Sequence, residues 1–172
     1  MRMTERGVSV GHSPINRWAI RFLSLIEKNS RNEKPPVENS WRMDEIDIKV
    51  KGAWKYLYRP VDKAGKTVDF LLTAKRDMAA ARRFFNTAMR DNDVPEKVTI
   101  DKSGVNKAAL DEVNAGRDLP IVVRQAKYLN NMVEQDHRAI ERATRPILNF
   151  KSFRSARNVL AGVELMHMIR KA

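Results

Sequence analysis

Three acidic residues stand at places in the sequence where a carboxylate could do more than face solvent. The first, Asp44, shares its side of an alternating segment with Ile46 and Val50, while Glu45 and Asp47 fall on the opposite side. Because burying an unpaired charge is costly, an acid on the apolar side needs a cation or hydrogen bonds to compensate it. A salt bridge or an exposed strand end would also account for Asp44, and the sequence leaves both open.

The other two acids lie far along the chain. Asp101 ends the apolar run 98–100, and open α/β sheets place their ligands at the carboxyl ends of strands. It could equally be a turn or helix-capping aspartate. Glu134 falls in the first turn of a predicted helix, where an ion pair with Arg138 is the simplest role. Together, the three carboxylates are oxygen ligands of the kind that Mg²⁺ prefers. Two such ions can activate an attacking oxygen and stabilise a leaving one in phosphodiester chemistry.

The elements that would carry these acids change type along the chain. Alternating apolar residues and turn signals predict three strands, over 42–51, 53–61 and 67–74. Beyond them, helices and short strands are predicted in alternation: helices at 77–90 and 106–115, strands at 97–101 and 121–124, and closing helices at 131–145 and 152–170. In the last helix we expect Met166 and Ile169 in the core.

This order of elements, βββαβαβαα, predicts an α/β fold. Three hairpin-linked strands followed by strands that alternate with helices imply a mixed five-stranded sheet with helices on both faces. The succession matches the ribonuclease-H-like fold. In such a sheet the first strand, the fourth strand and a late helix can bring Asp44, Asp101 and Glu134 together.

The start of the chain is predicted to be a separate DNA-binding element. The Ser-Pro pair at 13–14 is a helix start signal, and apolar residues follow it at helical spacing with Arg17 and Arg21 left to solvent. With an upstream helix this is the outline of a helix-turn-helix, although an ordinary amphipathic helix has the same pattern. We therefore expect a helix-turn-helix region over 1–28, a polar linker over 29–40 and a catalytic domain over 41–172.

The net charge points to a polyanionic partner. The chain has 33 basic and 21 acidic residues, a net charge of +12, and the excess is spread along its length. A charge of this kind favours nucleic acid, because each neutralised phosphate releases condensed counterions; a merely basic protein is the alternative. The predicted DNA contacts are Arg17, Arg21, Arg138, Arg142, Arg145, Lys151 and Arg154.

The composition also excludes several kinds of site. The chain contains no cysteine, so a disulfide scaffold, a thiolate metal site and a cysteine nucleophile are ruled out. The sequence shows neither a secretory signal nor an apolar run of membrane-spanning length. We expect a cytoplasmic, nucleoid-associated protein without a membrane partner.

Several blocks of the sequence carry a family resemblance. They are ERGVSV at 5–10, WRMDE at 41–45, VDKAGKTVDFLLTAKRD at 61–77, VTIDKSG at 98–104 and RQAKYLNNMVEQDHRAI at 124–140. In their order and spacing they resemble the DDE transposases of small bacterial insertion sequences, most closely insertion-sequence family six.

The resemblance implies both a site and a reaction. Asp44, Asp101 and Glu134 would be the catalytic triad and the ligands of two Mg²⁺ ions, for which Mn²⁺ can substitute. The reaction implied is nicking at a transposon end, which exposes a 3′ hydroxyl, and then strand transfer of that hydroxyl into target DNA. The family also implies a homo-oligomer that pairs two ends.

The sequence departs from the family pattern in three places. The region before residue 28 is shorter than the family's helix-turn-helix, so we expect an amino-terminally truncated copy. Glu141 replaces a basic residue seven positions after Glu134, and Asp47 replaces a tyrosine two positions after the WRMDE block. These departures keep two other hypotheses open: a catalytically inactive DNA-binding remnant, and a metal-dependent nuclease of the same fold.

Overall fold

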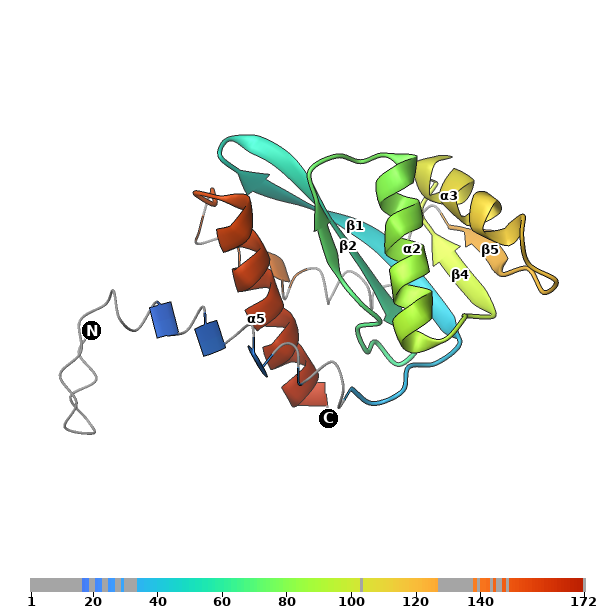
Figure 1. The fold of residues 1–172 in the computed structure, drawn as a ribbon, viewed down its shortest axis with the longest axis horizontal. Coiled ribbons are helices and arrows are strands. Elements are labelled where there is room, and N and C mark those ends of the chain that lie inside the picture. Colours follow the sequence, from blue (N-terminus) through green and yellow to red (C-terminus); the bar gives the residue numbers. More distant parts are fainter. Residues whose placement is uncertain are drawn as a thin grey trace.

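A five-stranded mixed sheet forms the centre of the fold in the computed structural model (Figure 1). The structure describes residues 17–18, 21–22, 25–26, 29, 34–102, 104–126, 138, 140–142, 144, 147 and 149–171. The strands are β1 (Ser40–Val50), β2 (Ala53–Asp62), β3 (Leu71–Thr73), β4 (Lys97–Ile100) and β5 (Val122–Gln125). The helices are α2 (Met78–Asn92), α3 (Gly104–Asn114) and α5 (Phe153–Lys171).

The strand order β3-β2-β1-β4-β5 combines antiparallel and parallel pairing. β1 and β2 form a long antiparallel hairpin, while β1–β4 and β4–β5 are parallel. The hairpin turns at Lys51 and Gly52, whose φ angles of 50° and 79° are the left-handed values that a tight two-residue turn requires. The predicted mixed sheet is therefore confirmed.

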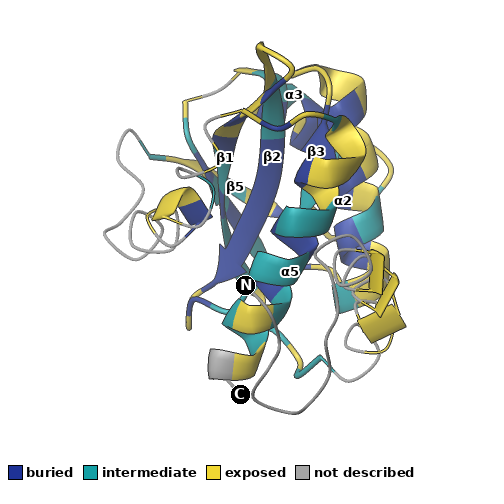
Figure 2. Cartoon of the chain, turned by 90° about the vertical axis from the view of Figure 1, so that its left-hand side faces the viewer, coloured by how far each residue is buried: buried dark blue, intermediate teal, exposed yellow. Residues whose placement is uncertain are grey.

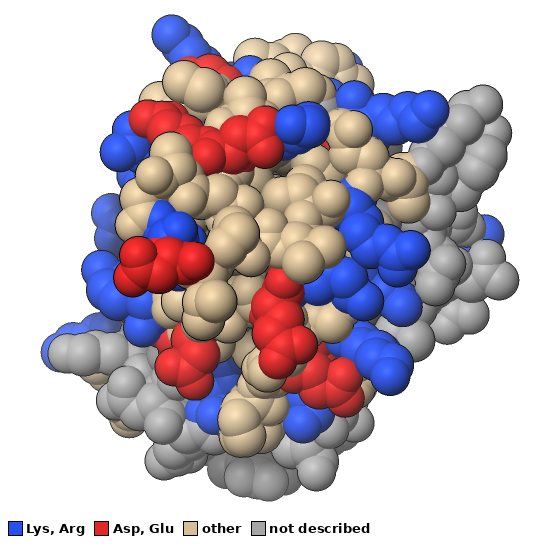
Figure 3. Space-filling model, turned by 90° about the vertical axis from the view of Figure 1, so that its right-hand side faces the viewer, with Lys and Arg blue, Asp and Glu red and all other residues tan. Residues whose placement is uncertain are grey.

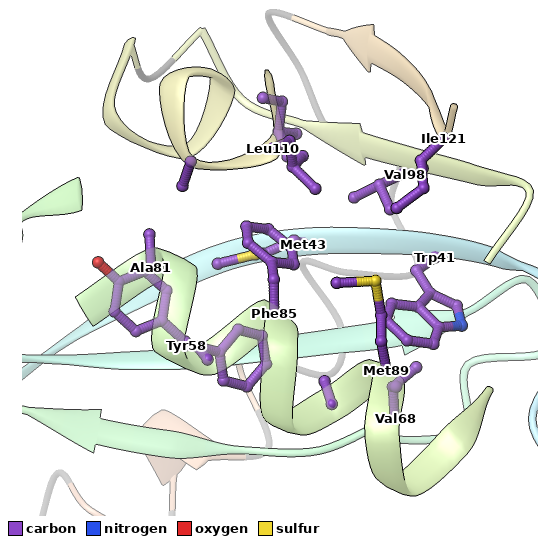
Figure 4. Close-up of a cluster of buried hydrophobic side chains, with 14 of the residues drawn as sticks. Trp41, Met43, Tyr58, Val68, Ala81, Phe85, Met89, Val98, Leu110 and Ile121 are labelled. Atoms are coloured by element: carbon purple, nitrogen blue, oxygen red, sulfur yellow. The ribbon is translucent and has the colours of Figure 1, made fainter. Parts of the chain in front are cut away.

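Helices cover both faces of the sheet, and each face has its own core. One core joins Trp41, Met43 and Tyr58 to α2 and α3, with the ring of Tyr58 stacked on Phe84 at 5.6 Å (Figure 4). The other joins the side of β1 that carries Ile46, Ile48 and Val50 to α5. Burial on both faces makes the second half of β2, residues 57–62, the most protected part of the sheet (Figure 2).

Most predicted elements match the structure to within two or three residues. Asp77 caps α2 as expected, since its side chain accepts a hydrogen bond from the N–H of Ala80 at 2.8 Å. β3 is much shorter than the predicted 67–74, because Val68 donates its N–H to the Pro60 carbonyl outside the β3 ladder and Thr67 makes only an isolated bridge.

The expectation that Met166 and Ile169 are core residues is wrong. Their side chains are 52% and 61% exposed, because α5 turns this face away from the sheet and packs through Ala156, Leu160 and Ala161 instead. No helix within the described ranges is both long and apolar enough to cross a membrane.

Two regions of the prediction lie largely outside the described residues. In the first predicted helix only 17–18, 21–22, 25–26 and 29 are described, and these residues are helical. The predicted helix-turn-helix as a whole lies outside the described residues. In the helix predicted at 131–145, residues 138, 140–142 and 144 are helical, whereas Glu134 and Arg145 lie outside the described part.

Candidate acidic site

Asp44 and Asp101 each follow the last pair of the β1–β4 ladder by two residues. That pair is Arg42 with Thr99, and Asp101 comes just past the end of β4. Both acids are half-buried. The third predicted acid, Glu134, is outside the described residues, and the triad therefore remains a prediction.

Asp44 is held on the α5 side of β1, as the alternation predicts. The backbone N–H of Glu45 donates to Asp44 Oδ1 at 2.8 Å, which fixes the carboxylate at its own strand position. Across the antiparallel pair Asp44 lies opposite Arg59 of β2. The acid thus stands next to a fixed cation and not at a frayed strand end.

Arg59 belongs to a buried polar cluster that ties α5 to the sheet. Its guanidinium forms an ion pair with Glu164 of α5 and donates to the Thr67 hydroxyl at 2.6 Å. Thr67 in turn donates to Glu164 Oε2 at 2.9 Å. Arg59 is 1% exposed and Glu164 is 7% exposed, so the pair is shielded from solvent. The cluster anchors the helix directly behind Asp44.

A second polar cluster, on the opposite face, was missed by the sequence analysis. The alternation puts Glu45 on the polar side of β1, yet its side chain is only 5% exposed. Asn106 of α3 donates to Glu45 Oε1 at 2.7 Å, and Arg76 Nε lies 2.6 Å from Glu45 Oε2. The same arginine reaches Asp101, with 3.6 Å between its terminal nitrogen and Asp101 Oδ2. Arg76 therefore links a buried acid to one of the predicted catalytic acids.

The electrostatics of this cluster also report how close the acids lie. Burial raises the pKa of Glu45, the hydrogen bond from Asn106 and the charge of Arg76 lower it, and the charges of Asp101 and Asp44 raise it again. Burial raises the pKa of Tyr58, which pairs with Glu45 across the hairpin, to about 12. Three carboxylates thus share one small region of the sheet.

The predicted DNA contacts that the structure describes are all on the surface. Arg17, Arg21, Arg138, Arg142, Lys151 and Arg154 are exposed, as is Glu141. Exposure permits contact with DNA and does not test it. Arg145 lies outside the described residues.

Comparison with known proteins decides the family. A family model described as a DDE domain, of the IS240 transposase type, matches residues 38–172. The transposase of the insertion sequence-like element IS431mec from Staphylococcus aureus is 36% identical over 171 residues, which are 98% of this chain and 75% of that protein. This chain belongs to the DDE transposases of insertion sequences. The transposase of IS257 in transposon Tn4003, also from Staphylococcus aureus, is 36% identical over 96% of this chain and 73% of its own length.

Solved structures place the transposase in the ribonuclease-H-like fold. The HTLV-2 integrase catalytic core domain, solved in complex with magnesium, matches 65% of this chain and 74% of its own with a TM-score of 0.53 at 17% identity. The catalytic core domain of BIV integrase matches 78% of this chain and 86% of its own with a TM-score of 0.54 at 11% identity. At such identities the likeness concerns the fold, and the predicted fold class is confirmed.

Proposed function

We propose that this transposase nicks DNA at a transposon end and joins the new end to target DNA, with Asp44, Asp101 and Glu134 as its catalytic residues. The observation that carries the proposal is the β1–β4 register: its last pair is Arg42 with Thr99, which supports Asp44 and Asp101, two residues further along the chain, as neighbours. The carboxyl ends of parallel strands are where α/β sheets bind their ligands. Membership of the DDE family supports the assignment of all three acids.

The chemistry of these side chains fits a divalent metal ion. Carboxylate oxygens are the ligands of Mg²⁺ and Mn²⁺, and the chain contains no thiol that would favour a softer metal. Within the described residues no group of three acidic or histidine side chains forms a complete metal site. The proposal assigns Glu134 as the third ligand, on the resemblance to the family. When bound, two Mg²⁺ ions would activate the attacking oxygen and stabilise the leaving one.

The chain's own residues would hold the acids in place for this reaction. The N–H of Glu45 orients the Asp44 carboxylate, and Arg76 holds Asp101 against the buried Glu45. In the first step, water attacks a phosphodiester at the transposon end, and the bond to the 3′ oxygen breaks to leave a 3′ hydroxyl. In the second, this hydroxyl attacks a target phosphodiester and displaces a new 3′ oxygen, so the number of phosphodiester bonds is conserved.

The partners follow from the same proposal. Transposon ends and target DNA are the substrates, and the net charge of +12 supports binding to their phosphates. Joining two ends requires two active sites, so we expect a homo-oligomer. A protein that acts on chromosomal DNA would be found at the bacterial nucleoid.

A single assay tests the proposal. The chain is incubated with a pre-cleaved transposon end, a supercoiled target plasmid and Mg²⁺, and the products are separated by gel electrophoresis. We expect joined product from the wild type and none from Asp44→Asn, with the melting temperature and DNA affinity of the variant retained. Asp47→Asn is the matched control, because Asp47 is an exposed acid on the other side of the same strand.

The other hypotheses give different products in the same assay. DNA that is bound but neither cut nor joined would identify an inactive binding remnant. Nicked plasmid without joined product would identify a nuclease of the same fold. Joining that survives Asp44→Asn would remove Asp44 from the active site.

A further inference from the structure

The turn of the β1–β2 hairpin and the start of α5 form one surface at the end of the molecule (Figure 1). The hairpin extends beyond its neighbours, since β1 pairs with β4 only at 40–42 and β2 pairs with β3 only at 56–58. The turn is fastened to the segment before α5. Lys51 donates its N–H to the Phe150 carbonyl at 2.9 Å, and Gly52 donates to Asn149 Oδ1 at 3.0 Å. We call residues 49–55 and 149–157 together the tip surface.

All the charged residues of the tip surface are basic. Each of its two segments contains three basic residues and no acidic residue. By contrast, the face that carries α3 and β5 mixes acidic and basic side chains (Figure 3). Five of the six basic residues are exposed and Lys55 is half-buried. The six are Lys49, Lys51, Lys55, Lys151, Arg154 and Arg157.

An exposed aromatic ring lies among these charges. Trp54 is 57% exposed, although most large apolar side chains of β1 and β2 are buried. It pairs with Lys49 across the hairpin, and the Lys49 ammonium lies 5.6 Å from the centre of the ring. The left-handed φ angles at the turn and its hydrogen bonds to 149–150 fix the backbone of the turn next to Trp54. Lysines that reach phosphates, beside a ring that can pack on the sugars, can bind duplex DNA without reading its sequence.

We propose that the tip surface binds the DNA duplex on one side of the phosphodiester that is cut or joined. This inference rests on the proposed function, because it takes Asp44 as the position of the reacting phosphate. Lys51 is seven positions after Asp44, which is about 23 Å at the rise of a strand. At about 3.4 Å per base pair, the tip contacts DNA roughly seven base pairs from the reacting phosphate.

A purely structural role for Trp54 makes a different prediction. Cross-strand Trp–Lys pairs stabilise hairpins, and on that basis Trp54→Ala would lower the melting temperature and leave DNA affinity unchanged. DNA binding by the tip would instead make the effect of the substitution depend on the length of the DNA.

The test uses the full chain and two duplexes made from a pre-cleaved transposon end. One duplex extends about four base pairs from the joining phosphate and the other about fifteen, so only the longer one reaches the tip at 3.4 Å per base pair. We expect Trp54→Ala to weaken binding of the longer duplex several-fold and to leave binding of the shorter one unchanged. Trp54→Phe keeps a ring, and we expect its affinity for the longer duplex to lie between those of the wild type and Trp54→Ala.

The charges are tested through the salt dependence of binding. Lys51→Ala and Lys151→Ala should each lower the slope of log K against log salt by about 0.9 on the longer duplex. Lys63→Ala is the matched control: it removes the same charge from an exposed position just after the opposite end of β2. Its slope should equal that of the wild type.

The outcomes separate this inference from the proposed function. Equal affinity of Trp54→Ala and wild type for the longer duplex, with joining intact, would overturn the tip surface and leave the proposed function standing. If the wild type fails to join ends while Trp54→Ala still weakens binding of the longer duplex only, the proposed function is overturned and the DNA contact stands. Equal losses on both duplexes would also overturn the placement of the tip on DNA about seven base pairs from the reacting phosphate.

Discussion

Arg76 connects the surface of the acidic site to its buried support. Its guanidinium lies between Glu45, which is almost fully buried, and Asp101, which is open to solvent on one side. Asn106 completes the cluster from α3, so residues from β1, α2's leading loop and α3 meet at one point. We expect this cluster to position Asp101 without taking part in the reaction, because Arg76 connects Asp101 to the buried Glu45.

Replacing Arg76 should therefore affect both stability and turnover. In Arg76→Gln the Glu45 carboxylate loses its ion pair while it remains buried, which costs about 1–3 kcal/mol of unfolding free energy. We expect a lower kcat for strand transfer with little change in KM for DNA, since the variant misplaces Asp101 and leaves the DNA surface intact. Chemical denaturation and steady-state kinetics measure the two effects.

Arg82→Gln provides the comparison for this substitution. Arg82 forms an ion pair with Glu112, and both side chains are more than a third exposed. Exposed pairs of this kind contribute at most about 1 kcal/mol. If Arg76→Gln behaves like Arg82→Gln in both stability and kcat, Arg76 does not position Asp101.

At the scale of the elements, α5 is fixed to the sheet by a charge pair as well as by apolar packing. Arg59 of β2 and Glu164 of α5 are both buried, and Thr67 bonds to each of them. A buried pair of this kind adds little net stability compared with apolar residues, but the loss of one partner leaves an uncompensated charge. The pair therefore determines where α5 sits behind Asp44.

Glu164→Ala should be one of the most destabilising substitutions in the chain. Leaving the Arg59 charge buried without its carboxylate costs about 3–5 kcal/mol, or roughly 10 °C in melting temperature for a chain of this size. Glu112→Ala, which removes an exposed partner of the same type, should cost under about 1 kcal/mol. Calorimetry measures both, and similar losses would contradict the role given to Glu164. Replacing both partners with Arg59→Met and Glu164→Leu should recover part of the stability.

Local patterns in the sequence predict the elements well but not their long-range partners. Period-two alternation correctly puts Asp44 on the α5 side of β1, and Asp77 correctly marks the start of α2. The burial of Glu45 could not be predicted in this way, because the residues that cover it lie 31 and 61 positions away, at Arg76 and Asn106. The same limit explains Ile169, whose helical spacing resembles that of a core residue although its side chain is largely exposed.

At the scale of the whole molecule, the distribution of charge supports a separation between the proposed reaction site and the proposed DNA-binding surface. The acids gather where β1 and β4 run side by side, while the basic residues of the tip lie at the far end of the same hairpin. A carboxylate site repels DNA until cations neutralise it, so flanking basic surfaces have to supply the affinity. A negative charge on such a surface should measurably lower the affinity for DNA.

Glu141 allows the effect of such a negative charge on DNA affinity to be measured. It is exposed on a helical stretch between Ile140, which is buried in the α5-side core, and Arg142, a predicted DNA contact. Glu141→Lys reverses one charge, so we expect tighter binding to transposon-end DNA, a steeper salt dependence and more joined product. Glu112→Lys makes the same change of charge at an exposed position on α3 and should raise affinity only weakly, through the net charge. Filter binding at several salt concentrations distinguishes the two. If both variants show the same salt slope as each other, Glu141 does not face DNA, and the departure from the family pattern at this position has no effect on binding.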